Sequence, residues 1–541
     1  MHGHMSKRRT TSLVLALVLT AAACTGNKVN NSTDSAQSGE TTTSVATKSD
    51  PNAKVGGELK IGLEIRPETL DVMTANAVNT SSWAYISTSI YDGLTGRSPV
   101  DGKVENRLAE KIEPSADFRT WRVTLRTGIK FTDGSPLTAQ VVVDNYKFRA
   151  DPSNACPCIG NFKVMHPAVV NDNTLTITLD EPDAHLPDPK LLVPILAESL
   201  LTKGADRDKH PIGTGPFKLT NRDQLVVERN PDYWRKDDQG RKLPLLDKIT
   251  FVPVSDGNVR LADLDKGDID MLEAYDGPTI SAAKKDSAVK TNVSPGAGTI
   301  VAILNTATAP FDDIRMRMAV AQATDRDALA QSFPDGSQTS AQSFIDKNSP
   351  FKITGKFPDF DLAAAKKLTT AYGNEKGAHA LDLDVVCVTI PEAQAAMPIV
   401  MNQLRDAGFN PKLRMLDIGE YAATVLTKAT RNFDLACTRA SSFASDPAGI
   451  ATFVRSDGAV NVSGYNNPAM DKLFDQDKVT TDPAERLKIF QQVNDLVIKD
   501  LPYIPLLSNV AAIVTSDKVH GLSAIDADWA AHVDTAWLWK S

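Results

Sequence analysis

Four cysteines in the body of the chain form two pairs, and paired thiols can form disulfides or hold a metal. Cys387 and Cys437 each end an apolar, strand-like stretch, so we expect a disulfide between neighbouring strands rather than free thiols. Closing that loop would stabilise the fold by roughly 4 kcal/mol. Cys156 and Cys158 flank one proline and fit a tight disulfide or half of a metal site. No histidine lies within ligand spacing, so we favour the disulfide and expect no metal.

Sequence motifs of catalysis and nucleotide binding are missing from the chain. There is no G-x-S-x-G, no H-E-x-x-H and no Gly-Lys followed by Ser or Thr, and the eight histidines are scattered. Residues 213–216 read Gly-Thr-Gly-Pro, but the third glycine of a dinucleotide loop is missing and Pro216 stands where its helix would begin. We therefore expect a plain turn there, no catalytic residues and no cofactor.

The charge of the chain argues against one class of partner. It has 59 Lys and Arg against 67 Asp and Glu, a formal net charge of −8. Nucleic-acid binders usually carry the opposite sign, so we expect no nucleic-acid partner.

Residues 1–24 have the pattern of an export signal. Lys7 to Arg9 are basic, Leu13 to Leu19 form an apolar stretch too short to span a bilayer, and small residues precede Cys24. Small residues directly before a cysteine resemble a bacterial lipobox, although Ala21 stands where leucine is usual. We expect Cys24 to be acylated; the alternative is ordinary cleavage that leaves a free thiol.

The next segment, residues 25–55, is rich in Ser, Thr and Asn and has almost no large apolar side chains. Such a segment buries too little surface to offset the entropy of ordering, so it predicts a flexible tether. We expect an extracytoplasmic body, anchored by lipid to the outer face of the cell membrane.

Residues 381–438 alternate between strand and helix patterns. Strands are expected up to Cys387, over 411–416 and up to Cys437, with helices over 392–407 and from Tyr421. This order predicts crossover units on a mainly parallel sheet, in which ligands dock beyond the carboxyl ends of the strands. The loop Arg439 to Asp446 follows one such strand. Arg439 is a candidate anion contact there, or an ion-pair partner within its own domain.

Strand patterns also occur nearer the start of the body. They cover residues 57–63, 121–125, 130–134 and 174–179. Gly134 and Gly215 suit turn positions with positive φ, and Asp133 can bond the backbone of its turn. These features predict a mixed α/β fold.

Short motifs follow one another in order from about residue 56 to the end of the chain. They are residues 57–62, 90–94, 108–110, 121–134, 137–139, 211–217, 230–234, 315–319 and 501–506. Together they resemble the family 5 extracellular solute-binding proteins, the dipeptide and oligopeptide receptors of ABC importers. The resemblance covers nearly all of the chain after the tether.

The resemblance implies an α/β, two-lobed periplasmic-binding-protein-like fold of type II, with mixed sheets joined by a two-strand hinge near residues 301 and 508. It implies a first lobe of residues 57–83, 211–301 and 509–541, an inserted subdomain of 84–210, and a second lobe of 302–508. A solute would bind between the lobes of a monomer, and the closed form would meet the permease and its ATPase. The chain would not be an enzyme.

The resemblance also bears on the ligand. The family's peptide binders place an aspartate three residues before an Asp-Pro pair, where it meets the peptide's ammonium; here Phe443 precedes Asp446 and Pro447. Dipeptide receptors carry a basic residue just beyond the strand that ends here near Cys387, and residues 388–391 offer none. A buried ammonium without a counter-charge is costly, so we expect an oligopeptide or a modified peptide rather than a free dipeptide.

Alternative ligands are an oligosaccharide, a metal chelate or haem, and the alternative of another class is a secreted hydrolase or a non-transport sensor. The family turns the stretch after the first strand towards the cleft, which makes Asn79, Ser82 and Trp83 candidate ligand contacts. Asn305, just after the crossover, and Asp446, in the loop after the strand that ends at Cys437, are further candidates. Trp83 and Phe443 would stack on the ligand. The alternative for all of these residues is core packing or loop capping.

Overall fold

The computed structural model describes most of the chain beyond the tether. It covers residues 49–73, 81–98, 103–156, 158–188, 190–333, 338–343, 351, 353–426, 431–440, 446–522 and 533–541. The predictions for Cys24, Asn79 and Phe443 lie outside these residues. Among the described residues, none of the helices has the length and hydropathy of a membrane-spanning segment.

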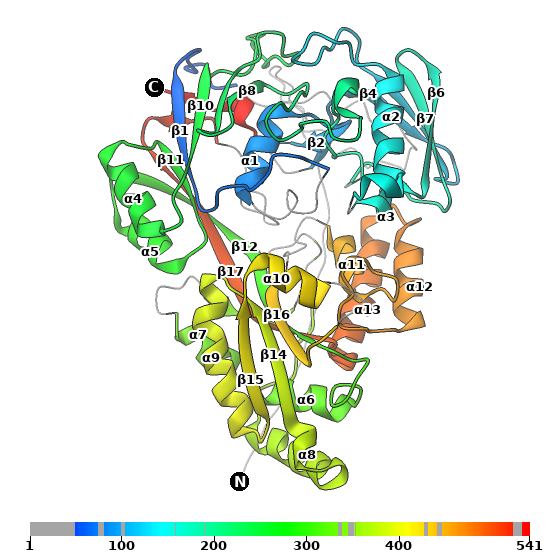
Figure 1. Ribbon diagram of the computed structural model, residues 1–541, viewed down its shortest axis with the longest axis vertical. Coiled ribbons are helices and arrows are strands. Elements are labelled where there is room, and N and C mark those ends of the chain that lie inside the picture. Colours follow the sequence, from blue (N-terminus) through cyan, green and yellow to red (C-terminus); the bar gives the residue numbers. More distant parts are fainter. Residues whose placement is uncertain are drawn as a thin grey trace, which may run out of the picture. The chain divides into compact units, whose positions relative to one another are not determined.

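Within the described residues, one mixed sheet of eleven strands organises the molecule (Figure 1). Its strands are β1 (Glu58–Leu63), β8 (Phe217–Asn221), β9 (Val226–Arg229), β10 (Lys248–Pro253), β11 (Met271–Ala274), β12 (Val289–Leu304), β13 (Gln338–Ser340), β14 (Asp382–Val388), β15 (Asn410–Leu416), β16 (Leu435–Ala440) and β17 (Tyr503–Ser516). Their order is β15-β14-β16-β12-β17-β11-β1-β10-β9-β8, with β13 paired to β17.

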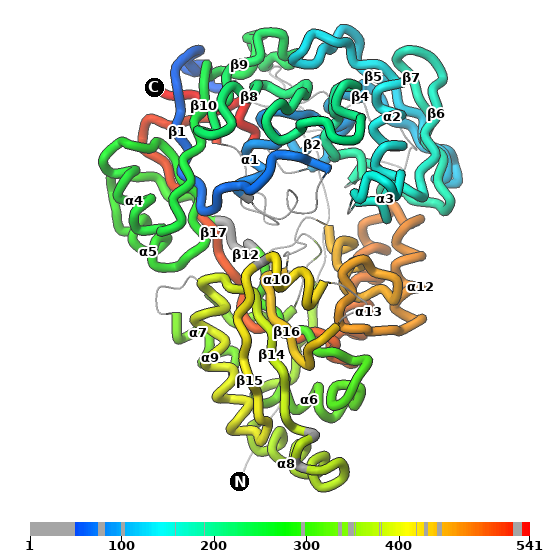
Figure 2. The backbone as a smooth tube through the Cα atoms, viewed as in Figure 1, coloured from blue at the N-terminus to red at the C-terminus, as the bar shows by residue number. Residues whose placement is uncertain are grey.

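The long strands β12 and β17 join the two halves of this sheet (Figure 2). They pair antiparallel from Val289 opposite Ser516 to Ile303 opposite Tyr503, with register shifts between Pro295 and Thr299 and after Ile300. One half of the sheet continues from β12 to β16, and the other continues from β17 to β11. The expected fold class, mixed sheets joined by two strands, is confirmed.

Separate hydrophobic cores lie on the two sides of this junction. We call the residues around the core of β12, β14, β16, α6 (Ile314–Ala323), α9 (Pro391–Asp406) and α13 (Pro483–Asp500) the second lobe. The first lobe surrounds the core of β1, β10 and α1 (Ser81–Ile90), together with β11. A third core, between Leu94 and Ala197, defines the inserted subdomain.

The crossover pattern predicted for residues 381–438 is present in the second lobe. β14 pairs parallel with β15 and with β16, and α9 ends just before Gly408, whose φ is +97°. Cys387 and Cys437 stand opposite each other on β14 and β16 and form a disulfide with an S–S distance of 2.08 Å. A disulfide also joins Cys156 to Cys158.

The inserted subdomain holds a four-stranded antiparallel sheet in the order β4-β5-β7-β6. Its elements are β4 (Ala109–Pro114), β5 (Thr120–Leu125), α2 (Ala139–Ala150), α3 (Ile159–Phe162), β6 (Met165–Asn171) and β7 (Thr174–Leu179). Val123 and Leu175, which face each other across β5 and β7, are fully buried.

Two predictions of local backbone structure were wrong. Residues 130–134 form a turn rather than a strand, because the carboxylate of Asp133 accepts the Ser135 N–H at 2.9 Å and Gly134 has a φ of +88°. Gly215 is needed for a close approach instead of a positive φ. A Cβ on Gly215 would lie 2.4 Å from the carbonyl carbon of Ile90.

Candidate ligand site between the lobes

The carboxyl ends of parallel strands from the two lobes face each other across the β12–β17 junction. β1 and β11 are parallel in the first lobe, and β14 and β16 are parallel in the second. Because β12 pairs antiparallel with β16 and with β17, and β17 pairs antiparallel with β11, the two sets run in opposite directions. Crevices beyond such ends are the usual place for ligands in α/β sheets.

Polar and charged side chains gather at these ends. We call Glu64, Ser82, Glu273, Tyr275, Glu392 and Arg439 the interlobe charge cluster. Glu64 follows β1, Tyr275 follows β11, Glu392 begins α9 after β14, and Arg439 is near the end of β16.

Arg439 is the member of the cluster that links the lobes. Its guanidinium donates a hydrogen bond to Glu392 in its own lobe, and its Cζ lies 5.4 Å from the ring centroid of Tyr275 in the first lobe. Glu392 and Tyr275 are 5% and 2% exposed. Burial lowers the pKa of Arg439, but the carboxylates of Glu392 and Glu64 outweigh burial and raise it.

Glu273 organises the half of the cluster that belongs to the first lobe. It is fully buried, and its Oε1 accepts the Ser82 hydroxyl and, at 2.9 Å, the backbone N–H of Glu64. The Tyr275 hydroxyl donates to Oε2 at 3.4 Å. Ser82 therefore lies in the cluster, as an anchor for Glu273.

The cluster has more carboxyl groups than guanidinium groups. Burial raises the pKa of Glu64 to about 7; Arg439 lowers it in part, and the neighbouring Glu273 and Glu392 raise it further. Near neutral pH, Glu64 is thus partly protonated. A cation placed beside it would favour the carboxylate and release that proton.

Arg260 also acts on Glu64 electrostatically, but it is engaged elsewhere. Its Nη1 donates to the carbonyl oxygens of Val254 and Ser255 at 2.5 and 3.0 Å. Its Nη2 lies 3.8 Å from a carboxylate oxygen of Asp276, so this acid balances its charge.

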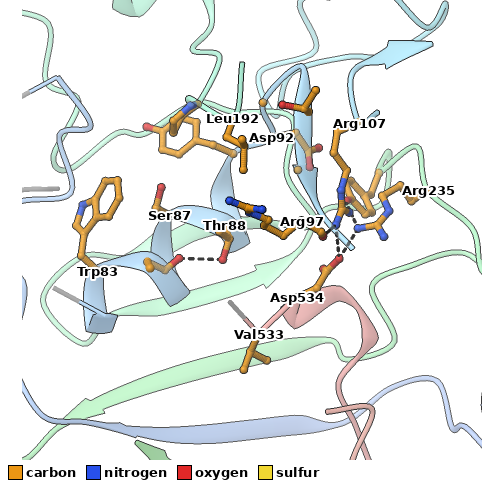
Figure 3. A pocket seen from close by; sticks show the side chains of 17 residues that line it. Trp83, Ser87, Thr88, Asp92, Arg97, Arg107, Leu192, Arg235, Val533 and Asp534 are labelled. Carbon is orange, nitrogen blue, oxygen red and sulfur yellow. Dashed lines mark hydrogen bonds and ion pairs between the residues drawn. The ribbon is translucent and has the colours of Figure 1, made fainter. Parts of the chain in front are cut away.

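Trp83, which follows Ser82 in the chain, lines a cavity of about 220 Å³ whose walls come from the first lobe and the inserted subdomain (Figure 3). The indole lies at one end of the cavity, and Arg107 and Arg235 lie at the other, where both donate to Asp534. The predicted stacking of Trp83 on a ligand stays a prediction.

Asn305 lies away from the cluster. Ile300 is opposite Arg439 in the β12–β16 pair, whereas Leu304 is opposite Leu435, so Asn305 lies at the other end of that pair. It is 3% exposed, and its amide donates to the carbonyl of Phe433 at 3.0 Å. The structure does not bring Asn305 together with Arg439.

Asp446 holds the start of a short 3₁₀ helix, Pro447–Ile450. Its carboxylate accepts the Ala448 N–H at 2.9 Å and pairs with Arg486 at 2.9 Å. Asp446 therefore anchors this 3₁₀ helix to Arg486 of α13.

Sequence reasoning missed Glu64, Glu273, Tyr275 and Glu392. A signal was available for two of them, because Glu64 directly follows the first strand and Glu392 directly follows the stretch 388–391 that was searched for a basic residue. Glu273 and Tyr275 carry no such signal. Pairing of β11 with β1 brings them to the site.

Comparisons with known proteins agree with this architecture. The model of the family "Bacterial extracellular solute-binding proteins, family 5 Middle" matches residues 103–461. The glutathione-binding protein GsiB of Salmonella choleraesuis is 29% identical over 461 residues, which cover 81% of this chain and 86% of that protein. GsiB of Escherichia coli O157:H7 is 28% identical over 464 residues, with the same coverage.

Solved structures of other proteins share this fold. The substrate-binding protein CtaP of Listeria monocytogenes has a TM-score of 0.74 at 25% identity, covering 90% of this chain and 100% of that one. AppA of Bacillus subtilis, in complex with a nonapeptide, has a TM-score of 0.76 at 21% identity and the same coverage. The chain belongs to the family 5 bacterial extracellular solute-binding proteins, which are extracytoplasmic substrate-binding components of ABC importers and not enzymes.

Proposed function

We propose that this chain is a lipid-anchored receptor that captures an oligopeptide or a modified peptide between its lobes and delivers it to an ABC permease. The observation that carries the choice of ligand is the charge balance of the interlobe charge cluster. Arg439 is already paired with Glu392, so the free carboxylate of a dipeptide would have to compete with a buried acid for it.

The same cluster offers a counter-charge for the other end of a peptide. Phe443 stands at the position of the family's ammonium-binding aspartate. Glu64, beside Glu273 and Glu392, can supply the negative charge from the first lobe instead. A ligand with a cationic end here and its carboxylate farther away fits a chain longer than a dipeptide.

Relatives support this class of ligand. The GsiB proteins are named for glutathione, a tripeptide with a γ-linked glutamate, and thus a modified peptide. DppA of Helicobacter pylori was solved with the peptide STSA and AppA with a nonapeptide. All three of these ligands are longer than a dipeptide, whereas AgaA was solved with agropinic acid and NikZ of Campylobacter jejuni with Ni(L-His). The choice of a peptide therefore rests on GsiB and on the charge cluster.

The membrane attachment follows from the sequence pattern around Cys24. We expect a diacylated Cys24 to hold the chain through its tether, as a monomer with one ligand site. Metabolic labelling with a radioactive fatty acid tests this. Label should enter the wild type but not Cys24→Ser; equal labelling would contradict the anchor.

A thermal-shift series on the full chain tests the ligand class. A ligand that binds only the folded state raises its stability by RT ln(1 + [L]/Kd). We expect shifts with glutathione or a tetrapeptide, and little shift with dialanine or maltotriose. A larger shift with dialanine than with both longer peptides would overturn the proposed specificity, and hydrolysis of a peptide would overturn the receptor function.

A further inference from the structure

A second contact joins the inserted subdomain to the second lobe and uses none of the residues of the interlobe charge cluster. Residues 181–185 of the inserted subdomain meet the carboxyl end of α12 (Pro468–Asp477) in the second lobe. The Ala184 N–H donates to the carbonyl of Lys478 at 2.6 Å, and His185 Nε2 lies 3.0 Å from the carbonyl oxygen of Asp477. In Figure 1, α12 and the subdomain helix α3 lie on the same side of the molecule.

This contact uses groups that a helix end leaves open. The last carbonyls of a helix have no partner within the helix, and a donor or a cation placed there is favourable. Here the donor to the Lys478 carbonyl comes from the inserted subdomain, and the Asp477 carbonyl is shared between His185 and the Thr480 N–H of its own lobe, which lies at 3.0 Å. Lys478 adds an ion pair to Glu181, with 3.0 Å between Nζ and Oε2.

A chain of ion pairs connects this helix end with the start of the 3₁₀ helix Pro447–Ile450. Asp477 is 3% exposed and receives Arg486 Nε at 2.7 Å, while Arg486 Nη2 reaches Asp446 at 2.9 Å. The guanidinium of Arg486 also lies 5.4 Å from the ring centroids of Phe351 and Phe490, which limit its movement. Asp446 caps the first turn of this 3₁₀ helix.

We propose that residues 181–185 and the end of α12 form a latch that holds the inserted subdomain and the second lobe together away from the β12–β17 junction, and that Asp477, Arg486 and Asp446 couple this latch to the 3₁₀ helix Pro447–Ile450. The contact is made of few bonds, two of them to backbone carbonyls. Such a contact can open without unfolding either lobe. Its coupling to ligand binding rests on the proposed function.

Hydrogen exchange on the ligand-free full chain tests the latch by itself. The double variant His185→Ala/Lys478→Ala should exchange about fivefold faster in residues 180–188 and 470–480, with β14 and α9 unchanged. Lys488→Ala is the matched control, because Lys488 pairs only with Glu485 of its own helix among the described contacts. Unchanged exchange at both segments in the double variant would overturn the latch.

Reversal of the charges at Glu181 and Lys478 separates loss of the contact from an effect on folding. Glu181→Lys places two cations together and should speed exchange at the same segments, and adding Lys478→Glu should restore the slow rate. Failure of the second change to restore it would contradict a direct contact.

The coupling is tested by residues 446–452, which should also exchange faster in the double variant His185→Ala/Lys478→Ala. Wild-type rates there would overturn the coupling.

A kinetic measurement then relates the latch to transport. Glutathione and a tetrapeptide should leave the double variant several times faster than they leave the wild type and Lys488→Ala. Equal dissociation rates would overturn the role of the latch in ligand retention. If neither peptide binds the wild type, the proposed function fails, while hydrogen exchange still decides whether the latch exists.

Discussion

Arg107 and Arg439 are both buried guanidinium groups, yet the carboxylates around them are balanced in one case and in excess in the other. Arg107 of the inserted subdomain shares Asp534 with Arg235, at 3.0 and 2.7 Å, and Arg107 also meets Glu105 at 2.7 Å. Two guanidinium groups thus form ion pairs with two carboxylates, and the third carboxyl group nearby, that of Asp92, accepts hydrogen bonds from Trp234 and Thr214 instead. This balance suits a group whose task is to hold the fold.

In the interlobe charge cluster, Arg439 is paired with Glu392 and lies near Glu64, which in turn lies beside Glu273, so one guanidinium group accompanies three carboxyl groups. A ligand cation can remove this imbalance. The difference indicates how to separate structural from ligand-binding charge in this molecule, because only an unbalanced group gains from an added charge.

The largest change in the free energy of unfolding is expected when the ion pairs of Arg107 are removed. Arg107→Met leaves Glu105 and Asp534 buried with half of their positive charge, and should lower the free energy of unfolding by about 3–5 kcal/mol. Denaturant unfolding measures this. Arg414→Met is the control, because Arg414 and its partner Asp384 are about 40% exposed. It should cost less than about 1 kcal/mol. Equal losses in the two variants would contradict the comparison.

Substitution of Glu64 is expected to change the free energy of unfolding by less and in the opposite direction, so that the chain becomes more stable. Its pKa is about 7 in the folded chain against an ordinary 4.5, so between these pH values the folded chain holds a proton that the unfolded chain has lost. The free energy of unfolding therefore falls as pH rises through this range. Glu64→Gln should stabilise the chain by about 2 kcal/mol at pH 8 and leave it unchanged at pH 4.

Thermal unfolding at the two pH values measures this change. The exposed Glu68, four residues away, gives the matched control Glu68→Gln, which should behave like the wild type at both. A loss of stability in Glu64→Gln at pH 8 would show that Glu64 is charged and well paired, against the proposed imbalance.

The smallest effect concerns Ser82. Its hydroxyl donates to the buried Glu273, so Ser82→Ala should cost about 1–2 kcal/mol. Denaturant unfolding measures this, and Ser82→Thr, which keeps the hydroxyl, should recover most of it. No loss in Ser82→Ala would mean that Glu273 does not depend on this hydrogen bond.

Features that depend on local pattern could be predicted from the sequence. The strand and helix alternation of residues 381–438 gave the parallel unit of the second lobe and placed Cys387 opposite Cys437. Residues 130–134 were predicted as a strand from their composition. They form a turn, because the carboxylate of Asp133 accepts a backbone N–H two residues further on.

The charge cluster could not be predicted in the same way. Glu64 and Glu273 are 209 positions apart and meet only through the pairing of β1 with β11. Periodicity within a segment carries no information about such pairing. The rule that ligands dock beyond strand ends would have selected Glu64 and Glu392, but not the buried Glu273.

The central claim is that the excess carboxyl charge of the interlobe charge cluster receives the cationic end of a peptide, and proton release on binding tests it most directly. Calorimetric titration of the full chain at pH 7 with a tetrapeptide, in two buffers of different ionisation enthalpy, measures this release. Binding should release about half a proton per chain, because Glu64 loses its proton to face the ammonium. An N-acetylated tetrapeptide, or the variant Glu64→Gln, should release none. Binding of the free tetrapeptide with equal heats in both buffers would contradict the account.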